Sequence, residues 1–155
     1  MKVGLTVRRA VVGDIAGVLR VERGSNGAPH WDESRYREMV EGSEAEALRR
    51  VLLVAAEGEL VVGFLVGAVV LDEAELESVV VDEARRRLGV GSALSEALFV
   101  WAVAQGATLI RLEVRAENVA AQTMYERLGF RPCGLRCGYY VDPVDDAVLM
   151  VKGLR

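Results

Sequence analysis

Three runs of apolar and β-branched residues occupy the middle of the chain, at 51–57, 60–70 and 75–81. Runs of this kind predict strands, and the short separators Glu57-Gly58-Glu59 and Leu71-Asp72-Glu73 are typical of turns between paired neighbours. We therefore expect an antiparallel meander of three strands.

The spacing of apolar residues changes on both sides of the meander. Helices are expected at about 12–23, from near Asp32, at about 90–104 and from Asn118 to Gly129. Further strands are expected at 3–9, at 108–114, from 130 to 140 and at 147–151, and a Gly/Ser/Asn loop at 24–29.

This order of elements predicts one α/β domain of mixed α+β type over residues 1–155. Strand 108–114 would lie parallel to strand 75–81 after a helical crossover, with the carboxyl ends of both strands side by side. Ligands tend to bind at such ends, next to the turn that leads into the crossover helix.

Composition restricts the class of protein. With 155 residues, 52% of them apolar, the chain is long enough to bury a core and too hydrophobic to be disordered. A net charge of −4 disfavours a nucleic-acid partner and suits a cationic substrate. Since no apolar stretch reaches about 18 residues and no signal-type segment opens the chain, we expect no membrane association and a cytoplasmic location.

Few residues suited to metal binding are present. Cys133 and Cys137 are the only cysteines and His30 is the only histidine, so we expect no metal site. In a reducing compartment, the two thiols are expected to be small buried or half-buried side chains rather than a disulfide. His30 is interpreted as a loop residue.

A glycine-rich turn separates strand 75–81 from the next helix, with the sequence Arg86-Arg87-Leu88-Gly89-Val90-Gly91-Ser92. Glycines let the backbone approach a ligand closely, and the first amides of a helix have no partner within the helix. Together with two arginines, these groups suit a pyrophosphate.

Other phosphate-binding turns do not match this segment. A dinucleotide-binding turn would have a third glycine where Leu94 stands, and a triphosphate loop would have a lysine, which is missing. By itself, the pattern also fits an ordinary glycine turn with solvated arginines. Its spacing resembles the coenzyme A pyrophosphate loop of the GNAT superfamily of N-acetyltransferases.

Glu113 is a candidate proton acceptor. Strand alternation places it with Leu109 and Arg111 on one face of strand 108–114, opposite Ile110 and the other apolar residues. Desolvation raises the pKa of a carboxyl group, so a carboxylate at a strand end beside a cleft can take a proton from an ammonium group. A salt bridge to Arg111, Arg115 or another surface cation is the alternative role.

Tyr125 is a candidate proton donor. It shares the apolar face of its predicted helix with Ala121, Met124 and Leu128, so its ring is expected to be buried. A phenol placed there could protonate a departing thiolate, whereas plain core packing is the alternative role.

From Glu75 to about Met150, the chain resembles the bacterial ribosomal-protein alanine N-acetyltransferases of the GNAT superfamily. The matching pieces are 79–82, 86–91, 112–118, 121–130, and the tail Gly138-Tyr139-Tyr140 with Pro143 and Asp146-Ala147. The resemblance implies the GNAT fold, in which a mixed, mostly antiparallel sheet is flanked by about four helices.

The resemblance also implies roles for these residues. Glu113 would be the base and Tyr125 the acid, and the separation of the pair, 125 − 113 = 12, follows the family. The residues implied in acetyl-CoA binding are Val79, Val80, Val81, Arg86, Arg87, Leu88, Gly89, Val90, Gly91, Ser92 and Asn118. A neutral amine would attack the thioester directly, with no cysteine nucleophile.

The acceptor is left open, because the first third of the chain departs from the family. Pro29-His30-Trp31 follows only loosely a proline-tryptophan segment that shapes the acceptor groove there; the expected acceptor-binding residues are Trp31, Tyr139 and Tyr140. The acceptor would be a protein N-terminus, such as that of a small-subunit ribosomal protein beginning with alanine, or a small amine. A coenzyme A-binding domain without turnover is the third alternative. A monomer or weak homodimer is expected.

Overall fold

The structure is a computed structural model that describes residues 4–25, 31–42 and 47–154. Val3, most of the expected 24–29 loop, and the residues Pro29 and His30 lie outside the described residues.

The described elements follow the expected order closely. They are β1 (Leu5–Arg9), the 3₁₀ turn η1 (Val12–Asp14), α1 (Ile15–Arg23), α2 (Glu33–Glu41), β2 (Leu48–Glu57), β3 (Leu60–Val70), β4 (Glu73–Val81), the 3₁₀ turn η2 (Glu83–Arg85), α3 (Val90–Ala104), β5 (Leu109–Arg115), α4 (Val119–Arg127), β6 (Arg131–Tyr140) and β7 (Asp145–Gly153). Asp32 and Asn118 cap α2 and α4, where each side chain accepts a hydrogen bond from a first-turn amide, as their sequence positions predict.

The strands form one sheet in the order β1-β2-β3-β4-β5-β7-β6. Among the described strands, β4 and β5 pair in parallel and the other neighbours pair antiparallel. The expected antiparallel meander is β2, β3 and β4, so the prediction of a mixed, mostly antiparallel sheet flanked by four α-helices is confirmed.

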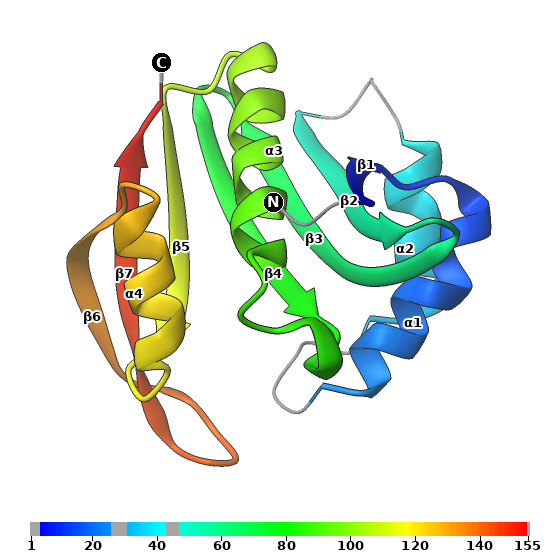
Figure 1. Cartoon of the computed structure of the whole chain (residues 1–155). Helices are drawn as coiled ribbons and strands as arrows, with labels where there is room; N and C mark the ends of the chain where they lie inside the picture. The colour runs from blue at the N-terminus through cyan, green and yellow to red at the C-terminus, as the bar shows by residue number, and fades with distance from the viewer. Residues whose placement is uncertain (1–3, 26–30, 43–46, 155) are drawn as a thin grey trace.

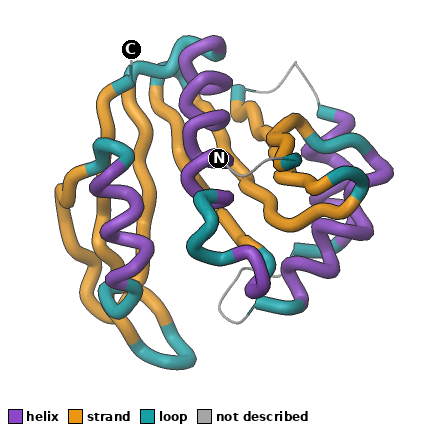
Figure 2. The backbone as a smooth tube through the Cα atoms, in the orientation of Figure 1, coloured by secondary structure: helices purple, strands orange, loops and turns teal. Residues whose placement is uncertain are grey.

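Each face of the sheet carries a layer of helices, as Figures 1 and 2 show. Residues of α3 and α4, including Leu94, Leu98 and Tyr125, bury one face together with Ile110 and Met150. The other face is buried under α1 and α2, which cover β2, β3 and the end of β4. This second layer does not extend over β5 and β7. The part of this face that carries Glu113 therefore has no helix upon it.

The parallel strands β4 and β5 stay paired over a short length only. Their register runs from Glu73 opposite Leu109 to Glu75 opposite Arg111, and beyond it the strands diverge, as Figure 1 shows. The expectation that their carboxyl ends lie side by side is therefore wrong. A β-bulge at Glu77, the extra residue in β4 against β3, bends the strand where the divergence begins.

Cys133 and Cys137 are also placed differently from the expectation of buried or half-buried thiols. Both are exposed free thiols on β6. The reason is that β6 is the edge strand of the sheet, and its residues from Arg131 to Tyr139 are all exposed.

Gly67 on β3 lets α3 approach the sheet. A Cβ atom at this position would lie 2.3 Å from Cδ1 of Leu98, whose side chain is fully buried. The position is therefore closed to any larger residue unless α3 moves away.

We expect Gly67→Ala to lower the free energy of unfolding by about 1–3 kcal/mol, because the added methyl group overpacks the contact with Leu98. Chemical denaturation measures this change. Gly13→Ala is the matched control, since a Cβ at Gly13 meets no atom within 4 Å. Equal stabilities of the two variants would contradict this account of the helix–sheet contact.

Candidate active site

The glycine-rich turn leaves β4 at Asp82 and enters α3 through two residues with left-handed backbone. Arg87 has φ 63° and Gly89, the N-cap of α3, has φ 83°. Left-handed residues within a turn let successive amides point to one side, which makes a concave anion site. Gly89 provides no side-chain cap, so the first amides of α3 remain available to a ligand.

Positive charge gathers at the same turn. Arg86 and Arg87 are both exposed, and neither forms a salt bridge with a described carboxylate. Arg85, the residue before them, is paired instead with Glu57 at 2.9 Å. Nε of Arg86 donates a hydrogen bond of 3.4 Å to the carbonyl of Val81, whereas the Arg87 guanidinium has no described partner. The turn therefore presents two guanidinium groups without a carboxylate partner beside the open start of a helix.

Val79, Val80 and Val81 form the last part of β4, next to this turn. On one edge they pair with β3, whereas the register with β5 has already ended at Glu75 and Arg111. Their backbone groups on the β5 side have no strand partner among the described residues. This free edge is able to hydrogen-bond an extended ligand lying between β4 and β5.

Glu113 lies on β5, on the face without helices, and its side chain is 25% exposed. Alternation along β5 is as expected, because Ile110, Leu112 and Val114 are buried on the opposite face. The Glu113 carboxylate forms a salt bridge of 3.5 Å with the guanidinium of Arg136 on β6. An ion pair with a surface cation is thus present, although its partner is not a neighbour on the same strand.

Two tyrosines at the end of β6 stand next to Glu113. Hydrogen bonding to Glu113 raises the pKa of Tyr139, and burial together with the charge of Glu113 raises the pKa of Tyr140. The two rings are in edge contact, with centroids 5.1 Å apart. Both phenols therefore keep their protons at neutral pH.

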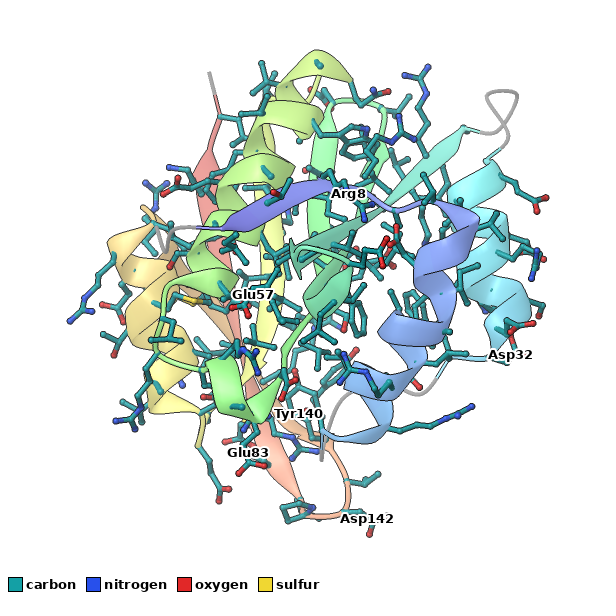
Figure 3. The ribbon with its side chains drawn as sticks, turned by 45° about the vertical axis from the view of Figure 1, so that its right-hand side comes forward. Arg8, Asp32, Glu57, Glu83, Tyr140 and Asp142 are labelled. Atoms are coloured by element: carbon teal, nitrogen blue, oxygen red, sulfur yellow. The ribbon has the colours of Figure 1, made fainter. Side chains whose placement is uncertain are left out.

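Arg115 on β5 contacts Tyr140 and the loop that follows it. Its guanidinium lies 4.4 Å from the centroid of the Tyr140 ring and donates hydrogen bonds to the carbonyls of Val141 and Pro143. Figure 3 shows Asp142 at the outer end of this β6–β7 loop and Tyr140 closer to the sheet. Arg115 thus determines where the loop stands relative to Glu113.

Tyr125 on α4 reaches the same region from the other layer. Its side chain is buried, and its ring packs edge-on against Phe130 at 5.6 Å. Burial raises its pKa, and the nearby Tyr140 raises it further. Its hydroxyl group forms no hydrogen bond with a described residue, so a buried ring carries an uncommitted donor.

Asn118 is only partly available for a ligand. Its Oδ1 atom accepts the hydrogen bond from the amide of Ala121 that caps α4. The side-chain amide nitrogen is left as a donor.

A cavity of about 380 Å³ opens beside Glu113 on the face without helices. Four carboxylates and three guanidinium groups line it, namely Glu73, Glu75, Glu77 and Glu113 with Arg50, Arg111 and Arg136. Each arginine pairs with one carboxylate, and Glu75 forms no salt bridge with a described residue. Burial, and then the charges of Glu77 and Glu113, raise the pKa of Glu75.

No described contact joins Trp31 to Glu113, Tyr139 or Tyr140. Its backbone amide donates to Glu22, and its ring packs 6.0 Å from that of Tyr36. The hydroxyl of Tyr36 donates to the same buried carboxylate, which fixes the chain at the start of α2.

The structure thus brings Glu113, Tyr139, Tyr140 and Tyr125 together and leaves Trp31 with α2. Sequence reasoning did not assign Arg136 or Glu75 to the site, and it named Arg115 only as a possible salt-bridge partner of Glu113. Alternation on β5 placed Arg115 on the side of Glu113, but no sequence signal pairs Arg136 with Glu113, since the bulges in β6 set that register.

Within the described part of the chain, no group of His, Cys, Asp or Glu side chains is arranged to hold a metal ion. The same part of the chain has no helix that is both long and apolar enough to span a membrane.

Comparison with known proteins is consistent along the chain. A sequence model of the Acetyltransferase (GNAT) family matches residues 18–130. The [ribosomal protein bS18]-alanine N-acetyltransferase of Escherichia coli K12 is 32% identical over 139 residues, which cover 88% of this chain and 89% of that protein.

Solved structures agree with the sequence comparison. The ribosomal-protein-S18-alanine N-acetyltransferase from Escherichia coli superposes with a TM-score of 0.82 at 30% identity, over 97% of this chain and 94% of that one. Ard1 from Thermoplasma volcanium superposes with a TM-score of 0.81 at 29% identity, over 99% of both chains. Because the family model covers more than half of the chain and these relatives match most of its length, the protein belongs to the GNAT family of acetyltransferases and is an acetyl-transferring enzyme.

Proposed function

We propose that this enzyme acetylates the N-terminal α-amino group of a protein, with acetyl-CoA as the donor and a ribosomal protein that begins with alanine as the acceptor. The observation that carries the proposal is the position of Glu113, which opens to a cavity on one sheet face while the glycine-rich turn and Tyr125 lie on the other. Donor and acceptor can thus approach from opposite faces. The name of the Escherichia coli relative supports this acceptor.

The chain's own groups fit acetyl-CoA. Arg86 and Arg87 supply positive charge that no described carboxylate neutralises, which suits a pyrophosphate. A Cβ at Gly89 would meet no atom within 4 Å, so the turn is open to a ligand. The free edge at Val79–Val81 suits an extended chain of amides, and Asn118 keeps one donor. When bound, acetyl-CoA would supply the acetyl thioester that the amine attacks.

Glu113 would accept the proton of the incoming amine. An α-ammonium group must become neutral before its nitrogen can attack, and a carboxylate within hydrogen-bond reach, directly or through one water, can take that proton. The 25% exposure of Glu113 at the cavity allows an acceptor to reach it.

Tyr125 would hold the proton that the departing thiolate takes up. Its raised pKa keeps the phenol protonated at neutral pH, and its hydroxyl group is not used by a described residue. Direct attack by the amine needs no covalent intermediate on the enzyme. The exposed thiols of Cys133 and Cys137 on β6 are therefore given no role.

The cavity supports a polypeptide acceptor over a small amine. Its rim includes the exposed residues Glu75, Arg111 and Arg136, so an acceptor bound at Glu113 can extend into solvent. Its carboxylates outnumber its guanidinium groups by one, which favours a cation. A small amine would be better matched by a closed pocket.

The function is tested by following coenzyme A release from acetyl-CoA with three kinds of acceptor. We expect turnover with a hexapeptide that begins with alanine and none with its N-terminally blocked copy carrying a lysine. Turnover with small amines alone would move the assignment to a small-amine acetyltransferase, and tight acetyl-CoA binding without turnover would contradict an enzyme role.

We expect Glu113→Gln to lower kcat/KM for the alanine peptide by about 10²–10⁴-fold at neutral pH, because the amide cannot take the proton. Raising the pH should recover part of the rate, since more of the free amine is then present. The measurement is a pH profile of kcat/KM. Glu126→Gln, an exposed carboxylate on α4, is the matched control and should follow the unmodified enzyme.

Tyr125→Phe should lower kcat by about 10²-fold or more while the Kd for acetyl-CoA stays nearly constant. Its melting temperature should also stay constant, because the hydroxyl group forms no hydrogen bond with a described residue. Rapid-quench kinetics and calorimetric binding separate these quantities. A kcat equal to that of the unmodified enzyme would leave Tyr125 with a packing role only.

Arg87→Ala should weaken acetyl-CoA binding by about tenfold, since one charge-assisted contact to the pyrophosphate is lost. Use of S-acetyl-pantetheine, which lacks the pyrophosphate, should not change. Arg127→Ala, an exposed arginine at the end of α4, serves as the control. An equal loss with both donors would contradict a pyrophosphate contact.

A further inference from the structure

Arg136 holds the place beside Glu113 where a cationic acceptor would bind. Its guanidinium lies 3.5 Å from a Glu113 oxygen and 5.4 Å from the centroid of the Tyr139 ring. An ammonium group bound at Glu113 would seek the same carboxylate and the same aromatic ring. The two cations therefore compete for one position.

A cation at this position matters because Glu113 is the proposed base. An arginine stays charged at any working pH, and a cation beside a carboxylate favours its ionised form. A base that must accept a proton from an ammonium group is thus opposed by a guanidinium that remains in contact with it. Glu113 can act with full effect once Arg136 has moved away.

The contact of Arg136 is suited to displacement. Arg136 is 54% exposed, lies on the edge strand β6, and forms no hydrogen bond with a described residue. Arg50 is different, because its guanidinium grips Glu77 through two hydrogen bonds of 2.8 and 3.2 Å. Of the three arginines that line the cavity, Arg136 is therefore held more loosely than Arg50.

We propose that Arg136 is a positioning residue that occupies the acceptor's ammonium position on Glu113 in the free enzyme and is displaced when the acceptor binds. This inference rests on the proposed role of Glu113 as the base. The ammonium nitrogen then gives its proton to Glu113 and keeps the electron pair with which it attacks, while Arg136 stays protonated throughout.

Other charged and titratable groups also face Glu113. They are Glu75 on β4, Tyr139 and Tyr140 on β6, and Arg111 and Arg115 on the same face of β5, whereas β7 places the apolar Leu149 opposite Glu113. The surroundings of Glu113 therefore carry charges of both signs, and among the described residues Arg136 is the cation that contacts its carboxylate.

The test is the steady-state kinetics of the alanine peptide in two variants of this residue. In Arg136→Gln we expect the KM for the acceptor to fall severalfold while kcat stays within about twofold, because no resident cation competes for Glu113. Arg136→Lys keeps the charge and should keep the KM of the unmodified enzyme. The KM for acetyl-CoA should stay constant in both variants.

The control is Arg131→Gln, which removes an exposed arginine from the same strand and should change neither quantity. An unchanged or raised KM in Arg136→Gln, or an equal fall of KM in Arg136→Lys, would overturn the inference. If Glu113→Gln itself keeps the kcat/KM of the unmodified enzyme, the proposed base is wrong, and that failure is distinct from one confined to Arg136.

Discussion

The site depends on a single interruption of hydrogen bonding, where β4 and β5 stop pairing after Glu75 and Arg111. Adjacent parallel strands normally satisfy each other's backbone groups along their length, which closes the sheet to ligands. Here the bulge at Glu77 turns β4 away, and a free backbone edge is left at Val79–Val81. The sheet is thereby opened between its two faces at the point where Glu113 stands.

The helices α3 and α4, which share one face of the sheet, keep this opening in place. α3 packs on β2, β3 and β4, whereas α4 packs on the β5 side through Tyr125 and Phe130. The two helices meet at Gly91, where a Cβ would lie 3.2 Å from Sδ of Met124 and 3.9 Å from Cγ2 of Val81. The first turn of α3 therefore lies against both α4 and the end of β4.

The two faces of the sheet differ in their charged and titratable groups. On the face under α3 and α4, burial keeps the Tyr125 phenol protonated, and the arginines of the glycine-rich turn attract an anion. On the open face, carboxylates exceed guanidinium groups at the cavity, which attracts a cation. Tyr140 lies between the two environments, since, beyond the effect of burial, the charge of Glu113 raises its pKa on one side and Tyr140 itself raises the pKa of Tyr125 on the other.

The sequence alone determined the elements, their order, the glycine-rich turn and the faces of β5, because these follow from local periodicity, capping and turn chemistry. The candidates Glu113 and Tyr125 were also found there, with help from a family resemblance. Only the tertiary structure decided that β4 and β5 separate, that Arg136 and Arg115 surround the site, and that Cys133 and Cys137 are exposed. Those features depend on bulges, strand order and edge position, which arise from contacts between residues distant in the chain and leave no local pattern.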